Sequence, residues 1–122
     1  MDATILVVDD ALFARNMVKR ALKNGGYERI VEASNSVEAI ERFTEHKPDL
    51  TLLDITLSDS NDLTLLAKLL ELRPEAKIVM CSAIGQDLII ADALNTGAKD
   101  FITKPFDEQD LLAVVMSVLS DE

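Results

Sequence analysis

The chain has 122 residues, 48% of them hydrophobic, which predicts one compact domain over residues 1–122. Its formal net charge of −10 at pH 7 repels phosphate backbones, and no cluster of lysines and arginines stands beside aromatic residues, so we expect no direct binding of nucleic acid. The single cysteine, Cys81, cannot form an internal disulfide and no apolar stretch approaches membrane-spanning length, so we expect a cytoplasmic protein that does not enter membranes.

Short aliphatic runs alternate with longer amphipathic segments along the whole chain. The aliphatic runs predict strands at Thr4–Val8, Ile30–Ala33, Leu50–Asp54, Lys77–Ser82 and Asp100–Thr103. The amphipathic segments predict five helices. They cover Ala11 to about Asn24, a stretch from the expected N-cap Ser36 to just before Pro48, about Asp62–Leu72, about Gln86–Thr96, and a last segment that begins near Asp107.

Five strand–helix units without a linker predict a single α/β domain. The strands are built on continuous aliphatic runs rather than on alternating apolar and polar residues, which indicates a parallel sheet covered by helices on both faces. In an open parallel sheet, ligands bind at the carboxyl ends of the strands. Residues that directly follow the predicted strands are therefore the candidates for a functional site.

Polar side chains stand at that end of four predicted strands: Asp9, Asp10, Asp54, Ser82 and Lys104. Each has a simpler explanation when taken alone. Asp10 is explained as the N-cap of the first helix and Asp54 as the cap of a turn, while the serine satisfies a strand end and the lysine is a solvated charge. Because all of them fall at strand ends of one sheet, a shared site is the better interpretation.

A cluster of carboxylates recruits a hard cation such as Mg²⁺, which binds one or two carboxylates together with phosphate oxygens. Lys104 would then offset the charge of a phosphoryl group, and the Ser82 hydroxyl would donate to one of its oxygens. Asp54 remains as a nucleophile that forms an aspartyl phosphate. The sequence contains no Walker-type or dinucleotide-binding glycine pattern, so the phosphoryl group must come from a partner or a small donor.

Four segments, VVDDALFAR, PDLTLLDIT, IVMCSAIG and GAKDFITKPF, resemble in order and spacing the receiver domains of two-component response regulators, and specifically the CheY-like chemotaxis family. The resemblance covers essentially the whole chain. It implies a flavodoxin-like, doubly wound (βα)5 fold with strand order 2-1-3-4-5. It also implies that Asp9, Asp10, Asp54 and the backbone carbonyl of Thr56 hold Mg²⁺, and that Asp54 accepts the phosphoryl group.

The same resemblance implies roles for four residues near the end of the chain. Ser82 and Lys104 would bind the phosphoryl group, and Phe101 matches the aromatic position that changes packing when the domain switches. Pro105 matches the proline whose peptide bond with the preceding lysine is cis.

Two departures from the family pattern follow the phosphoacceptor. Leu57-Ser58 replaces Met-Pro and Asn61-Asp62 replaces Asp-Gly, and asparagine and aspartate are the residues that best tolerate a left-handed backbone in place of glycine. A further difference concerns hydrolysis, because in this family the residues two beyond the phosphoacceptor and the hydroxyl residue influence the attacking water. These are Thr56 and Ile84, and an isoleucine cannot orient water, which predicts slow loss of phosphate unless Ile84 serves only in packing.

Two surfaces are candidates for partners. The first helix carries Arg15, Lys19 and Lys23 at four-residue spacing, which is either a solvated face or a docking surface for an acidic histidine kinase or histidine phosphotransferase. The last two helices are aliphatic nearly all round, which indicates deep packing or an exposed surface. By resemblance, the fourth helix, fifth strand and fifth helix would bind an output target or form a homodimer.

The leading hypothesis is therefore a Mg²⁺-dependent phosphoryl-accepting switch of the CheY type, a signalling protein rather than an enzyme. A phosphorelay intermediate and the isolated receiver of a transcriptional regulator are alternatives that use the same chemistry. A scaffold that binds partners without being phosphorylated is an alternative of another class.

Overall fold

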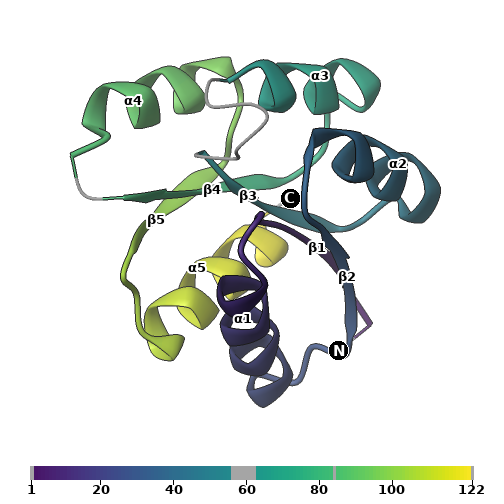
Figure 1. Cartoon of the computed structure of the whole chain (residues 1–122), viewed down its shortest axis with the longest axis vertical. Coiled ribbons are helices and arrows are strands. Elements are labelled where there is room, and N and C mark those ends of the chain that lie inside the picture. The colour runs from purple at the N-terminus through teal and green to yellow at the C-terminus, as the bar shows by residue number, and fades with distance from the viewer. Residues whose placement is uncertain (1, 56–62, 84, 122) are drawn as a thin grey trace.

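The computed structural model describes residues 2–55, 63–83 and 85–121. Its centre is a five-stranded sheet in the order β2-β1-β3-β4-β5, with every neighbouring pair parallel (Figure 1). The strands are β1 (Thr4–Val8), β2 (Arg29–Ala33), β3 (Leu50–Asp54), β4 (Ile78–Ala83) and β5 (Asp100–Lys104). This confirms the predicted α/β class and the implied strand order, and each predicted strand agrees with the structure to within one residue at either end.

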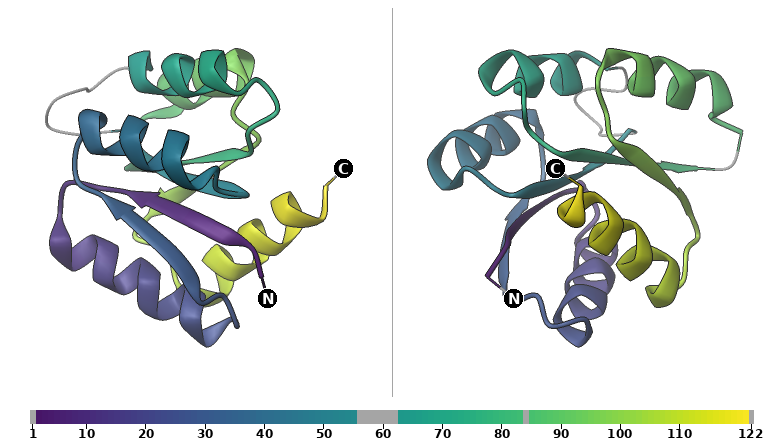
Figure 2. Two further views of the ribbon diagram at one scale, coloured as in Figure 1. Left: turned by 90° about the vertical axis from the view of Figure 1, so that its right-hand side faces the viewer. Right: turned by 180° about the vertical axis from the view of Figure 1, so that it is seen from behind.

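Five helices connect and cover the strands. They are α1 (Leu12–Asn24), α2 (Ser36–His46), α3 (Thr64–Leu72), α4 (Asp87–Thr96) and α5 (Glu108–Ser120). α1 and α5 lie on one face of the sheet, and α2, α3 and α4 lie on the other (Figure 2). Among the residues that the structure describes, every helix is too short or too polar to cross a membrane.

The start of α2 corrects one detail of the sequence interpretation. Asn35 is the N-cap, and its side-chain oxygen accepts a hydrogen bond from the backbone N–H of Glu38 at 2.8 Å. The Glu38 carboxylate in turn accepts from the backbone N–H and the hydroxyl of Ser34, both at 2.8 Å. The prediction of Ser36 as the cap is wrong by one residue, because serine and asparagine are equally good caps and stand side by side in the sequence.

The core consists of two apolar layers, one on each face of the sheet. Leu6 and Val8 of β1 point toward α2, α3 and α4, whereas Ile5 and Val7 point toward α1 and α5. Successive side chains of a strand point to opposite faces, so a strand covered on both faces is buried along its whole length and mostly apolar. β3 shows this fully, since all five of its residues are buried. The two layers give the carboxyl ends of the strands a rigid support.

Candidate functional site

The strand register brings the first candidate carboxylates together. Val8 of β1 pairs with Leu53 of β3, so Asp9, the next residue, continues alongside Asp54. Asp54 itself pairs with Cys81 of β4, and Ser82 follows at the end of that strand. The carboxyl ends of the three central strands therefore carry two carboxylates and a hydroxyl side by side.

Three of these polar residues are buried. Asp9, Asp54 and Ser82 are only 5%, 6% and 3% exposed, whereas Asp10 is exposed. A buried carboxylate loses its hydration, which costs several kcal/mol unless a cation or hydrogen-bond donors replace the water (roughly 2–7 kcal/mol even for an uncharged polar group). The fold therefore keeps two charges in a place where each needs a partner.

Lys104 supplies that partner in the structure. Its Nζ donates to Oδ2 of Asp9 at 2.8 Å and to Oδ2 of Asp54 at 3.3 Å. Burial by itself lowers the pKa of the Lys104 amine, but the hydrogen bond to Asp9 and the charges of both carboxylates outweigh it, so this pKa lies above its usual range. The lysine is charged at neutral pH, and the peptide bond that follows it, Lys104-Pro105, is cis.

Asp9 is held on several sides. Its Oδ1 accepts from the backbone N–H of Ala11 at 2.9 Å, and its own N–H donates to the carbonyl of Ala33 in β2 at 3.1 Å. Ala11 is the N-cap residue of α1 and makes no side-chain capping bond. The interpretation of Asp10 as the N-cap of this helix is therefore wrong.

The basic residues of α1 behave differently from the sequence hypothesis. Arg15 Nε lies 3.0 Å from Glu32 Oε1, and Lys19 Nζ lies 2.9 Å from Glu32 Oε2. The Lys19 ammonium, with the Arg15 guanidinium, holds the pKa of the Glu32 carboxyl below its usual range against the opposing effect of its partial burial. Two of the three residues on the proposed basic face are thus paired within the chain, which weakens their case as a docking surface for an acidic partner.

The carboxylates fit a divalent cation. Asp9, Asp10 and Asp54 each offer one oxygen, and these three oxygens all lie within 4.8 Å of one another. Such an oxygen-only set suits Mg²⁺, which takes one or two carboxylates and keeps its other positions for water or phosphate oxygens. Thr56, whose carbonyl the resemblance assigns to the same ion, lies outside the described residues, as do Leu57, Ser58, Asn61, Asp62 and Ile84.

Three further residues lie near the site: Phe101, Gln86 and Arg15. Phe101 in β5 is 39% exposed, and Gln86 accepts a hydrogen bond from the N–H of Ala83 through its side-chain oxygen at 2.6 Å. Arg15 donates from Nη1 to the backbone carbonyl of Asp9 at 2.7 Å. This contact to the site was not predicted, and the pairing of Arg15 with Glu32 spans 17 residues, which no local sequence pattern reveals.

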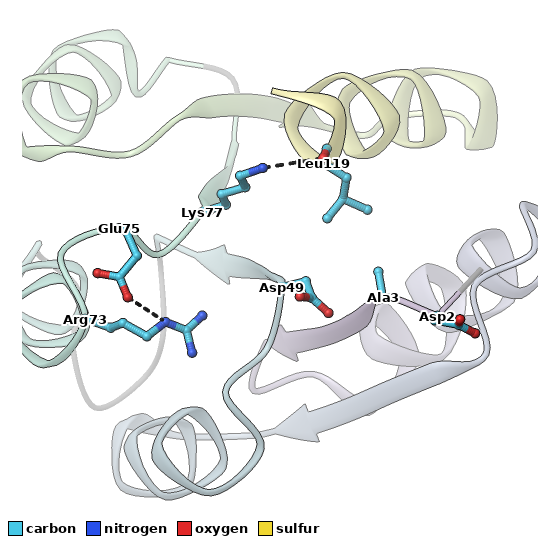
Figure 3. A pocket seen from close by; sticks show the side chains of 7 residues that line it. All are labelled: Asp2, Ala3, Asp49, Arg73, Glu75, Lys77 and Leu119. Atoms are coloured by element: carbon cyan, nitrogen blue, oxygen red, sulfur yellow. Dashed lines mark hydrogen bonds and ion pairs between the residues drawn. The ribbon is translucent and has the colours of Figure 1, made fainter. Parts of the chain in front are cut away.

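Several surface hollows lie outside the carboxylate cluster, and two of them bear on function. One, of about 540 Å³, lies at the opposite, amino end of the strands, where Arg73 pairs with Glu75 and Lys77 donates to the carbonyl of Leu119 (Figure 3). Its cations are bound to groups of the chain itself, so it is a poor candidate for a ligand site. The second is an apolar groove of about 340 Å³ that begins at Lys104. It is lined by Phe13, Ala14, Met17, Val18, Lys104, Pro105 and Phe106.

Comparison with known proteins agrees with this geometry. A family model described as the response regulator receiver domain matches residues 5–116. The chemotaxis protein CheY of Bacillus subtilis is 42% identical over 116 residues, which cover 95% of this chain and 97% of that protein. The chemotaxis protein CheY of Listeria monocytogenes is 46% identical over 102 residues, covering 84% of this chain and 86% of that protein. The crystal structure of the receiver domain of NtrX from Brucella abortus superposes with a TM-score of 0.91 at 34% identity, covering 97% of this chain and 99% of that one. The chain therefore belongs to the family of response regulator receiver domains.

Proposed function

We propose that the protein is a phosphoryl-accepting switch in which Asp54 is the phosphoacceptor, with a role like that of the chemotaxis relatives. The observation that carries the proposal is the buried Asp54 carboxylate, surrounded by the carboxylates of Asp9 and Asp10 and by the Lys104 ammonium. This arrangement supplies a nucleophile together with the charges that a phosphoryl group requires. A scaffold without phosphorylation would have no use for such a costly cluster.

The reaction is a transfer from a phosphohistidine of a kinase or phosphotransferase, or from a small acyl phosphate. A carboxylate oxygen of Asp54 attacks phosphorus, and the new O–P bond forms as the bond from phosphorus to the leaving atom of the donor breaks. The electron pair of that bond departs with the donor. The protein catalyses only its own phosphorylation and dephosphorylation, and we class it as a signalling switch.

Mg²⁺ fits this site through Asp9, Asp10 and Asp54, and we expect the Thr56 carbonyl to contribute. When bound, the ion offsets the negative charge of the phosphoryl oxygens as they approach three carboxylates. Lys104 turns from its carboxylate partners toward a phosphoryl oxygen. The Ser82 hydroxyl, at the end of the next strand, donates to another.

The apolar groove beside Lys104 supports a protein donor. Phe13 and Met17 of α1 are 77% and 50% exposed. They line the same groove as Lys104, which contacts Asp54. A phosphohistidine must approach Asp54 from the carboxyl ends of the strands, where the groove begins. A histidine kinase or histidine phosphotransferase would therefore bind with apolar side chains in the groove. The apolar residues are a stronger basis for this docking than the paired Arg15 and Lys19.

A second surface supports an output partner. Leu88 and Leu94 of α4 and Phe101 of β5 are exposed large apolar residues. Phosphorylation would draw Ser82 toward the phosphoryl group and favour inward packing of Phe101, which changes this surface. The change would be read by an output target or by a second copy of the chain.

The decisive experiment is the intact mass of the protein after incubation with acetyl phosphate and Mg²⁺. We expect a gain of about 80 Da in the native protein, the mass of one phosphoryl group on a carboxylate. The gain should vanish when a chelator removes Mg²⁺ and in the Asp54→Asn variant. The Asp49→Asn variant is a matched control, because Asp49 lies at the opposite end of β3.

The opposite result is equally informative. A folded protein that gains no mass, with the donor active on another receiver domain, would contradict the proposal and favour the scaffold function. A gain in mass that persists in the Asp54→Asn variant would show that another residue is the phosphoacceptor.

A further inference from the structure

Arg15 connects the candidate metal site to the framework of the sheet. Its Nη1 donates to the backbone carbonyl of Asp9 at 2.7 Å, and its Nε donates to Glu32 Oε1 at 3.0 Å. The guanidinium is planar and rigid, so two bonds from different nitrogens to different parts of the fold define its position. The side chain is 14% exposed, which limits competition from water for these bonds.

The carbonyl that Arg15 binds belongs to the peptide between Asp9 and Asp10. A peptide unit is planar, so fixing its oxygen also fixes the orientation of the Asp10 nitrogen and α-carbon. Asp9 has additional bonds to Ala33 and Ala11. The direction in which the Asp10 carboxylate leaves the backbone therefore depends on this peptide, and with it the shape of the three-oxygen set.

Glu32 holds the arginine in place. It lies on β2 opposite Val7 of β1, two residues before Asp9, and its second oxygen accepts from Lys19 at 2.9 Å. A free arginine beside a carboxylate cluster would pair with the carboxylates and compete with a metal ion. The pairing with Glu32 both orients Arg15 toward the Asp9 carbonyl and offsets its positive charge.

We propose that Arg15, oriented by Glu32, is a positioning residue that fixes the Asp9–Asp10 peptide and thereby sets the Mg²⁺ affinity of the site. The inference rests on the proposed function, since it assigns Mg²⁺ to these carboxylates. Partners that orient the ligands of a metal without touching it typically change its affinity by about 10- to 100-fold when they are removed. Arg15 acts on a backbone carbonyl rather than on a carboxylate oxygen, so its effect belongs at the lower end of that range.

The test uses Arg15→Lys, which keeps the charge but cannot donate from two fixed directions. Titration calorimetry of the metal-free protein with Mg²⁺ should give a dissociation constant about 10-fold higher than that of the native protein. Arg20→Lys is the matched control, because Arg20 is an exposed arginine on the same helix, and its Mg²⁺ affinity should be unchanged. In the metal-free state, amide hydrogen exchange at Asp10 and Ala11 should be several-fold faster in Arg15→Lys than in the control.

Glu32→Gln provides a second variant that preserves side-chain shape while removing the charge that holds Arg15. It should weaken Mg²⁺ binding in the same direction, and it keeps the inference testable if Arg15→Lys does not fold. Native protein that binds Mg²⁺, combined with unchanged affinity and unchanged exchange in both variants, would overturn the inference and leave the proposed function intact. Native protein that does not bind Mg²⁺ would overturn both.

Discussion

The ammonium of Lys104 lies 2.8 Å from Oδ2 of Asp9, although 95 residues separate them in the chain and β3 and β4 separate their strands in the sheet. The same nitrogen contacts Asp54 at 3.3 Å. One flexible cation thus balances two buried carboxylates of the metal-free protein. In the proposed switch, this flexible side chain would move aside when a metal ion and a phosphoryl group bind to the carboxylates.

Lys104→Met should increase the amount by which Mg²⁺ stabilises the folded protein. Without the ammonium, two buried carboxylates repel each other, and we expect a loss of about 2 kcal/mol in the free energy of unfolding of the metal-free protein. This is less than the roughly 3–5 kcal/mol of a fully buried pair because Lys104 is 32% exposed. Mg²⁺ binds only the folded form of such a site and should restore part of the loss.

Denaturation with chelator and with saturating Mg²⁺ measures this effect. The stabilisation by Mg²⁺ should be larger in Lys104→Met than in the native protein, while phosphorylation by acetyl phosphate should slow by about 100-fold. Lys99→Met, at an exposed lysine just before β5, is the control. Equal Mg²⁺ stabilisation in all three proteins would contradict the balancing role of Lys104.

Phe13→Ala should separate the two kinds of phosphodonor. Phe13 is 77% exposed, so its loss should change the free energy of unfolding by less than about 0.5 kcal/mol. If the groove seats a donor protein, transfer from a phosphorylated histidine kinase or phosphotransferase should slow by about 10-fold, the size of a typical interface contact. Phosphorylation by acetyl phosphate should not change, since a small donor does not need the groove.

The control for Phe13 is Val37→Ala on α2, which removes another exposed apolar side chain from the other face of the sheet. Rates of transfer are measured by rapid mixing with the phosphorylated donor. Equal transfer rates for Phe13→Ala and the native protein would show that the donor protein does not dock in the groove.

The stability contributed by Glu32 should depend on pH in the acid range. The pKa of Glu32 is lowered in the folded protein by Lys19 and Arg15, from an ordinary value of 4.5. A group with a lowered pKa stabilises the fold above its unfolded pKa, and this contribution is lost as the pH falls through the lower folded value. Glu32→Gln should therefore be less stable than the native protein near neutral pH, and the difference should shrink below pH 4.5.

Chemical denaturation of both proteins at a series of pH values measures this difference. Glu71→Gln, at an exposed glutamate near the end of α3, should show little difference from the native protein at any pH. A Glu32→Gln difference that is constant with pH would show that the carboxylate charge does not stabilise the fold.

Ile84→Glu should shorten the life of the phosphorylated protein. The prediction comes from the sequence, because Ile84 lies outside the described residues. A carboxylate can orient an attacking water and act as a general base, which contributes about 10²-fold or more when well placed. The loss of phosphate is followed by intact mass after the donor is removed, with Ile84→Leu as the apolar control, and unchanged rates in Ile84→Glu would indicate that this position serves in packing.

Much of the fold could be predicted from residue patterns. Strands such as Thr4–Val8 carry an uninterrupted aliphatic run, which predicts a parallel sheet covered on both faces, and the structure confirms this. The candidate carboxylates could also be predicted, because parallel strands that end at one edge of a sheet bring the residues after them together. The strand order came from the family resemblance rather than from any local pattern.

The pairing of charges required the folded chain. Arg15 and Lys19 look like a solvated or docking face from their helical spacing alone, yet both bind Glu32, which reaches them from the edge strand β2. The choice of Asn35 over Ser36 as a cap likewise depended on which residue left the helix in an extended conformation. Periodicity and strand-end chemistry are local properties of the chain, whereas the partner of a long, flexible charged side chain depends on which distant elements pack beside it.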